Sequence, residues 1–334
     1  MYKNNYKQNL YVTSLIFILV SGLICRSAVT QEVKKPTASR DAVVTPSDVF
    51  ATVERLNRSL DVLLEDREIK IAERTECVER GLGPMHVYQL VVVCVNMMHD
   101  FAVQNNLTPI PRVIVSPMKY TPADVKILAN LMHDYINRTA SALKIEELPK
   151  DIEKVSLKTP TDVFNEIHYL LKKLSALTGQ EKIDPNKVFA ELSRAVEDVK
   201  SILSQIDPAC RFKVNAPSSK PGLKPADVYA VCLETRHSIN KFRGDLNMDV
   251  VPVPKLSDIS FIRPTDVYLQ TQIIIAEINV LKMASNTASI TPLAIPVTQK
   301  RPSDCHQLAV MIRYLLGQVN SLKDIVKLAS MGTS

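Results

Sequence analysis

The chain lacks tryptophan altogether and has only eight glycines among its 334 residues. Aromatic residues make up 5 % of it. Both features are typical of a helix-rich chain and argue against an all-β fold, which depends on glycine in its many turns and on aromatic residues in its strands. We therefore expect an all-α protein.

No specific catalytic signature is present either. The sequence has no glycine-rich phosphate loop, no Gly-x-Ser-x-Gly, no His-Glu-x-x-His and no Cys-x-x-Cys-His haem signature. The net charge of +6 is modest for this length, and Lys and Arg are scattered among Asp and Glu, which argues against nucleic-acid binding. We expect a protein that is not an enzyme, needs no cofactor and binds no nucleic acid.

What the chain does have is a short motif, Pro-x-Asp-Val in its commonest form, that recurs eight times. Pro suits the first position of a helix. An Asp two residues later lies in the first turn, where it can cap the helix and where its negative charge interacts favourably with the helix dipole. Each copy therefore predicts a helix start. Capping explains these carboxylates without the cation or partner site that they could also form. The six are Asp48, Asp124, Asp162, Asp227, Asp266 and Asp304.

The spacing of the motif divides its copies into two sets of four. The copies begin at residues 45, 83, 121 and 159, and then, after a short step, at 184, 224, 263 and 301. A hydrophobic residue precedes the cap in six copies, as in a hydrophobic staple, but the last copy of each set has Lys158 or Lys300 there. This pattern predicts an internal duplication, so that residues 45–177 and 184–325 should superpose helix on helix in order.

Each motif is followed by a helical stretch and then by a proline-containing linker. Apolar residues recur at steps of three and four, as in Val267, Ile274 and Ile278, which predicts buried faces of helices of ~20 residues and ~30 Å. Extended linkers of ~14–18 residues reach ~45–60 Å, enough to return along such a helix. The helices of each set should therefore run parallel. The short 178–183 connection instead predicts an antiparallel hairpin of the fourth and fifth helices.

The N-terminal segment has the form of a secretory signal. Lys3 and Lys7 precede an apolar stretch that runs to Cys25, and small residues follow, so residues 1–27 are predicted to be a signal peptide. An uncleaved anchor is the alternative. Residues 28–44 are predicted to be a mobile lead-in, followed by domains at 45–180 and 181–334, with one continuous helical array without a boundary as the alternative. These features predict a periplasmic or secreted protein.

Five cysteines remain once the signal is removed. Cys77 and Cys210 lie in linkers, and Cys94 and Cys232 lie in the helices that follow them. We predict Cys77–Cys94 and Cys210–Cys232 disulfides, which the oxidising compartment would permit, with reduced buried thiols as the alternative. Cys305 occupies the motif's Val position and is predicted to stay unpaired.

One local repeat is a candidate metal site. Asn96-Met-Met-His-Asp-Phe101 resembles Asn130-Leu-Met-His-Asp-Tyr135, so that two helices carry His99, Asp100, His133 and Asp134. Adjacent His and Asp on a helix point ~100° apart, and the two copies differ by one turn relative to the motif. We therefore predict no metal site at these residues.

The sequence thus predicts an exported, internally duplicated, all-α protein of eight helices in two sets of four, joined by extended proline-containing linkers. Its expected role is non-catalytic binding or scaffolding, with a protein partner in the envelope or extracellular space. An oligomer is possible, and membrane association is expected only through an uncleaved signal segment. Two alternatives remain: a small-ligand-binding helical sensor, and a metal- or haem-binding bundle.

Overall fold

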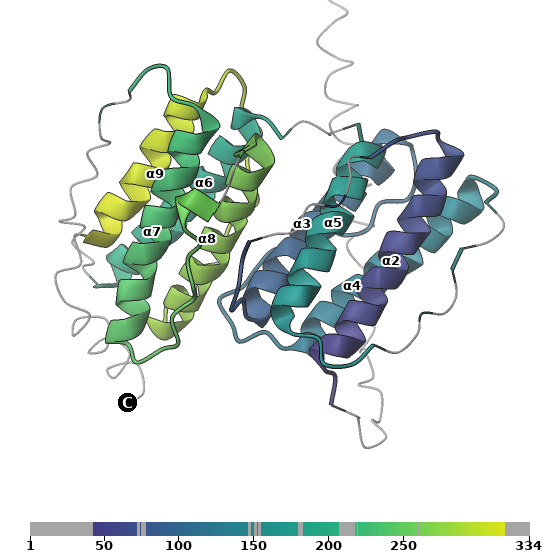
Figure 1. Cartoon of the computed structure of the whole chain (residues 1–334), viewed down its shortest axis with the longest axis horizontal. Coiled ribbons are helices and arrows are strands. Elements are labelled where there is room, and N and C mark those ends of the chain that lie inside the picture. Colours follow the sequence, from purple (N-terminus) through teal and green to yellow (C-terminus); the bar gives the residue numbers. More distant parts are fainter. Residues whose placement is uncertain are drawn as a thin grey trace, which may run out of the picture. The chain divides into compact units, whose positions relative to one another are not determined.

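The computed structural model is all-α and consists of packed helices that each begin with Pro, as predicted (Figure 1). These helices belong to one compact unit that begins at Val44. The predicted signal peptide and most of the lead-in lie outside the described residues. The structure describes residues 43–71, 74, 78–145, 148–149, 152, 155–179, 183–206, 218, 220–258 and 261–317.

Eight α-helices lie in this part of the chain, and they are 16 to 22 residues long. The connecting segments contain one short 3-10 helix, η1, in the residues described. The first helix set comprises α2 (Pro46–Asp66), α3 (Pro84–Gln104), α4 (Pro122–Ala142) and α5 (Pro160–Leu177). The second comprises α6 (Pro185–Ile206), α7 (Pro225–Asp245), α8 (Pro264–Ala284) and α9 (Pro302–Gly317), with η1 (Leu256–Asp258) between α7 and α8.

The motif's own side chains cap the helix starts. The Asp266 carboxylate accepts the backbone N–H of Arg263 at 2.7 Å, and the five other motif Asp residues do the same within 2.8 Å. In α3 the Nδ1 of His86 takes this role and accepts the N–H of Gly83 at 3.0 Å. A Lys or Arg at the cap position therefore does not remove this bond, because the Asp binds its backbone and not its side chain.

The four helices of each set run in the same direction, which confirms the prediction from linker length. Their first turns meet in one shallow depression per set, and such a meeting requires the four starts to share one end. In the first set it is lined by Pro46, Val49, Pro84, Val87, Pro122, Val125, Pro160 and Val163. In the second it is lined by Pro185, Val188, Pro225, Val228, Pro264, Val267, Pro302 and Cys305.

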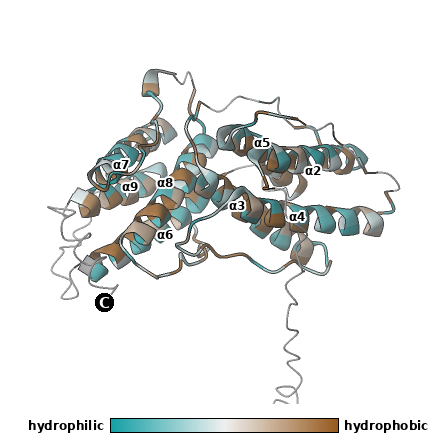
Figure 2. Ribbon diagram, turned by 90° about the horizontal axis from the view of Figure 1, so that it is seen from below, coloured by the Kyte–Doolittle hydropathy of each residue, from teal (hydrophilic) through white to brown (hydrophobic). Residues whose placement is uncertain are grey.

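Both sets pack their helices in the same order. In the first set, α2 and α3 each pack on α4 and α5; in the second, α6 and α7 each pack on α8 and α9. Consecutive helices such as α2 and α3 thus lie diagonally across the four-helix arrangement and do not pack on each other. Figure 2 shows apolar and polar residues alternating along the helices, as expected of amphipathic helices with one buried face.

The predicted hairpin of the fourth and fifth helices is wrong. α5 and α6 are not one of the packed helix pairs, whereas α3 and α8 pack across the two sets. Gln89 near the start of α3 donates to Gln272 of α8 at 2.8 Å, and His86 lies 3.7 Å from Glu277, further along α8. Because the earlier residue of α3 meets the later residue of α8, this contact is antiparallel.

The two lysines that break the staple pattern have equivalent contacts of their own. The Lys158 backbone N–H donates to the Ser47 hydroxyl at 3.0 Å, and its ammonium lies 4.4 Å from the Phe50 ring centroid. Lys300 likewise donates to the Asn186 side chain at 2.8 Å and lies 4.3 Å from the Phe189 ring. A cation–π contact with the first helix of each set therefore replaces the apolar staple in the last.

Helix side chains hold the extended linkers by bonding their backbone. Asn96 of α3 accepts the N–H of Val113 at 2.9 Å and donates to its carbonyl at 3.0 Å. Asn240 of α7 makes the same two bonds to Val251, at 3.0 and 2.6 Å. An extended segment laid against helices needs such partners, because its buried backbone groups have no helix or sheet to bond.

Replacing Asn240 with Ala should therefore lower the free energy of unfolding by about 2 kcal/mol, since Val251 is buried and loses both partners. Urea denaturation followed by circular dichroism measures this. The exposed Asn130 of α4 supplies the control substitution, which should cost less than ~0.5 kcal/mol. Equal effects of the two substitutions would contradict a clamping role for Asn240.

Within the described residues, α3 is the one helix long and apolar enough to cross a membrane. In its most apolar window 72 % of residues are buried inside the protein. Its run Leu90–Val95 lies in the core, as the sequence predicts for a buried helix.

Candidate functional site: a basic cavity between α5 and α8

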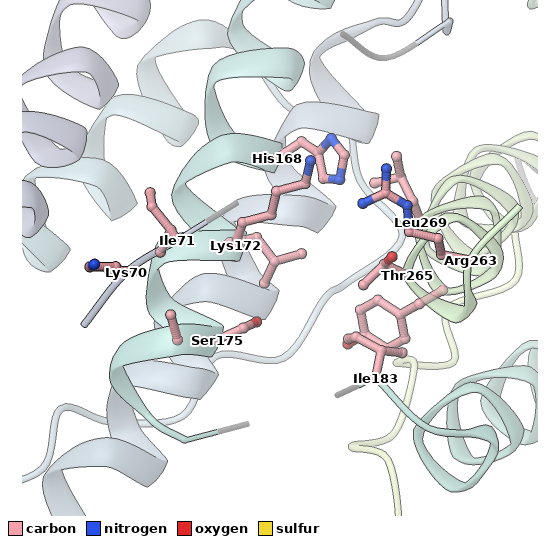
Figure 3. Close-up of a pocket in the computed structure, with 12 residues that line it drawn as sticks. Lys70, Ile71, His168, Lys172, Ser175, Ile183, Arg263, Thr265 and Leu269 are labelled. Atoms are coloured by element: carbon pink, nitrogen blue, oxygen red, sulfur yellow. The ribbon is translucent and has the colours of Figure 1, made fainter. Parts of the chain in front are cut away.

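A cavity of about 280 Å³ lies where α5 and the segment after α2 face the start of α8 (Figure 3). The α5 helix supplies residues from its second half, and α8 supplies residues from its first turns. The antiparallel contact between the two sets makes this possible: α5 runs parallel to α3, so the end of α5 lies opposite the start of α8. The lining residues are Lys70, Ile71, His168, Leu171, Lys172, Ser175, Ala176, Ile183, Arg263, Thr265, Tyr268 and Leu269.

The charged groups that the described residues place in this cavity all have the same sign. Lys70, Lys172 and Arg263 line it together with His168, and none of the described lining residues is acidic. His168 and Lys172 are four residues apart on α5 and therefore lie on one face of the helix. Figure 3 shows their side chains extending toward the guanidinium of Arg263 on the opposite side. The positive charges of Lys172 and Arg263 thus lie at the same end of the cavity, and Lys70 lies away from them.

His168 is the most unusual of these groups. Its side chain is 7 % exposed, and among the described residues it has no hydrogen-bond partner. Burial lowers the pKa of His168 to about 3, and the neighbouring Lys172 ammonium adds to that effect. The imidazole is therefore neutral near pH 7 and offers one N–H donor and one acceptor to the cavity.

The remainder of the lining is largely apolar. Leu171 and Leu269 are buried, and Ile183 and Tyr268 form a wall that this cavity shares with a second one. Burial raises the pKa of Tyr268 well above its ordinary value, so its phenol stays neutral. The cavity thus combines a cationic end with an apolar surface.

The second cavity, of about 480 Å³, lies between α3 and α6. Its described charged side chains are of both signs, unlike those of the first. Arg112 pairs with Asp100, and Arg194 pairs with Glu191. Side chains that neutralise one another in this way leave no net field to select a charged ligand, so the basic cavity is the stronger candidate site.

A fully buried charge cluster lies beside the contact between α3 and α8. The Arg236 guanidinium donates to Glu79 at 2.9 Å and to Gln270 at 2.9 Å, and it lies 3.3 Å from Glu277. Burial alone would lower the pKa of Arg236, but the carboxylates of Glu277 and Glu79 raise it. These paired groups are structural ties between the two helix sets.

The histidines of the local repeat, His99 and His133, have structural partners. The Nδ1 of His99 donates to the carbonyl of Ile110 at 2.5 Å, whereas His133 bonds Asn137 on its own helix at 3.1 Å. His99 thus helps Asn96 hold the linker after α3. No group of three or more His, Cys, Asp or Glu side chains is placed to hold a metal ion in the part of the chain that the structure describes.

The described cysteines Cys94, Cys232 and Cys305 are buried, and no disulfide joins any two of them. Burial raises the pKa of Cys232 and of Cys305 to about 12, so neither is a reactive thiolate near pH 7. The predicted partners Cys77 and Cys210 lie outside the described residues. The two disulfides therefore stay predictions.

Peptide mapping under non-reducing conditions tests the two predicted disulfides. In protein purified from an oxidising compartment, we expect Cys77 linked to Cys94 and Cys210 linked to Cys232, with Cys305 free. Each bond would add on the order of 3 kcal/mol by restricting the unfolded chain. Alkylation of all five thiols in denaturant without reductant would refute both bonds.

Sequence reasoning did not single out His168, Lys172 or Arg263 as a group. One feature of the sequence could have indicated the site: His168 lies on α5 directly beside the apolar stripe that contains Ile167 and Leu171. No known protein family, curated protein or solved structure matches the chain, so the interpretation of this site rests on its geometry.

Proposed function

We propose that this protein is a non-catalytic binding or scaffolding component that acts outside the cytoplasm, in the periplasm or as a secreted protein. Its partner would be another protein of the envelope or extracellular space. The observation that carries the proposal is where the exposed apolar side chains lie. Most of them are on the linkers and not on the helices: Ile114, Met118, Leu157, Val250, Leu256, Phe261, Ile290, Leu293 and Ile295.

Exposed apolar side chains on segments that are clamped to a rigid frame favour protein binding. Phe261 is 72 % exposed and Ile295 is 76 % exposed, on linkers before α8 and α9. Asn240 bonds Val251 on the first of these linkers, and Asn279 donates to the Thr291 hydroxyl on the second at 3.0 Å. Little ordering entropy would be lost when a partner binds such a surface.

We further propose that the two sets arose by duplication of a four-helix unit, with domains at 45–180 and 181–334. The shared packing order and the equivalent roles of Lys158 and Lys300 support this proposal. So does a third pair of bonds: Leu82 donates to Thr161 at 3.1 Å, and Leu223 donates to Ser303 at 3.4 Å. Both bonds join the residue before the second helix of a set to the start of the fourth.

The test is affinity capture from the native envelope or secretion fraction, with mass spectrometry. Wild-type protein should recover a specific partner, and the double substitution Phe261→Ser with Ile295→Ser should lose it. Ile127, which is 65 % exposed on α4, gives the control substitution Ile127→Ser, which should retain it. A protein found in the cytoplasm, or a partner that all variants recover equally, would contradict the proposal.

A second candidate function is binding of a small ligand, and the basic cavity favours it. Its volume of about 280 Å³ is near the lower end of the ~300–1,000 Å³ range of ligand pockets. The metal- or haem-binding alternative has no comparable support, since His99 and His133 have other partners.

A further inference from the structure

The basic cavity between α5 and α8 defines the chemistry of what it can hold. Its charged residues in the described part of the chain are all cationic, and the head groups of Lys172 and Arg263 lie at the same end. A cationic ligand would meet repulsion there, whereas an anion would gain charge-assisted hydrogen bonds from Lys172 and Arg263. Arg263 can present two parallel N–H groups to a carboxylate or phosphate.

His168 gives an independent indication that the cavity takes a ligand. A ring nitrogen that no protein group bonds is available to a ligand that enters the cavity. His168 is 7 % exposed and faces the cavity in Figure 3 without a hydrogen-bond partner in the described part of the chain. Its ring N–H could donate to an anion placed between Lys172 and Arg263.

The apolar lining limits the remainder of the ligand. Leu171, Ile183 and Leu269 offer surface that a highly polar ligand could not use. Contact with these side chains would remove apolar area from water on both partners, which favours a ligand with a hydrocarbon portion. The size of the cavity restricts that portion to a short one.

We propose that this cavity binds a small amphipathic anion, whose carboxylate or phosphate lies between Lys172, His168 and Arg263 and whose short apolar portion contacts Leu171, Ile183 and Leu269. The inference rests on the second candidate function, small-ligand binding, and is independent of the protein-partner proposal. A free carboxylic acid and a phosphate monoester share this chemistry.

Isothermal titration calorimetry of the full chain with four six-carbon probes tests the proposal. Hexanoate and hexyl phosphate represent the two sources of the anion, and hexan-1-ol and hexylammonium carry the same chain with a neutral or positive head. We expect one or both anions to bind saturably with one site per chain, at least tenfold more tightly than the alcohol and the amine. Whichever anion binds more tightly identifies the source.

Variants then locate the site. Arg263→Gln and Lys172→Gln should each weaken binding of the preferred anion about tenfold, because each removes one charge-assisted bond. His168→Phe should weaken it by about fivefold to tenfold. Lys241, exposed on α7 and outside the cavity, gives the control Lys241→Gln with the same loss of charge. Circular dichroism should show that all four variants are folded.

The outcomes separate the proposals. Equal affinity for hexan-1-ol and hexanoate would overturn the anion assignment and leave small-ligand binding in place. Weakening by Lys241→Gln as large as by Arg263→Gln would overturn the location. If none of the four probes binds, both this inference and the small-ligand function are overturned, whereas the protein-partner proposal is unaffected.

Discussion

Replacing Arg236 with Met should lower the free energy of unfolding by about 3–5 kcal/mol. Arg236 is fully buried on α7 and bonds Glu79, Gln270 and the carbonyl of Pro252. Its removal leaves the carboxylates of Glu79 and Glu277 buried without their cation, and both are charged groups that water no longer solvates. Urea denaturation at pH 7, followed by circular dichroism, measures the loss.

A rescue variant separates the charge effect from loss of packing. Glu79→Gln and Glu277→Gln in the Arg236→Met background remove the orphaned charges and should restore part of the lost stability. The control Lys241→Met changes an exposed cation on the same helix and should cost less than ~0.5 kcal/mol. An Arg236→Met variant as stable as Lys241→Met would show that the cluster does not stabilise the fold.

This cluster also shows why the contact between the two helix sets was hard to predict. Arg236 and Glu79 are 157 residues apart, and each is an ordinary surface-type residue in its own helical or linker context. Local periodicity carries no information about a partner at that distance. The same holds for Gln89 and Gln272, which pair across α3 and α8 at a separation of 183 residues.

Helix starts were predictable, because their determinants are local. Pro and the Asp two residues later act on the first turn itself, and linker length then sufficed to predict parallel helices. Helix ends were not. Ile69 bonds the carbonyl of Leu64 at 2.9 Å in a Schellman-type end, and the left-handed residue there is Glu68, with φ 55°. Lys144 plays the same part after α4, and neither residue type signals a helix end.

The failed hairpin has a related cause. A short connection between the fourth and fifth helices limits the distance between two helix ends, but it does not determine which faces pack. The face of α5 carries Ile167, Leu170 and Leu174, and these residues are buried in its own set, against α2 and α3. The remaining side of α5, with His168 and Lys172, then faces the start of α8 and forms the basic cavity.

The candidate site could not be predicted from the sequence, and the reason is physical. A His beside an apolar stripe commonly has a structural partner, as His99 has in the backbone carbonyl of Ile110 on the linker after α3. Only the packing shows that His168 has a cavity beside it and that Arg263, 95 positions later, points to the same place. The Pro motif predicted where Arg263 lies on its helix, but not what it faces.

The buried imidazole of His168 should make the protein lose stability in acid. Its pKa is about 3 in the folded protein and about 6.5 in the unfolded chain, so the unfolded state binds the proton first as pH falls. This loss of folding stability is absent above pH ~6.5 and grows as pH falls toward ~3. At pH 4 it corresponds to about 3 kcal/mol lost relative to pH 7.

The measurement is the difference between the unfolding free energies at pH 7 and at pH 4, from urea denaturation at each pH. His168→Gln keeps a polar side chain that cannot titrate, so this difference should be about 3 kcal/mol smaller than in wild type. His237, exposed on α7, provides the control, and His237→Gln should keep the wild-type difference. If His168→Gln lost as much stability in acid as wild type, the imidazole would have to be protonated in the folded protein. The cavity would then carry a further positive charge, and an anion would bind it more tightly as pH falls.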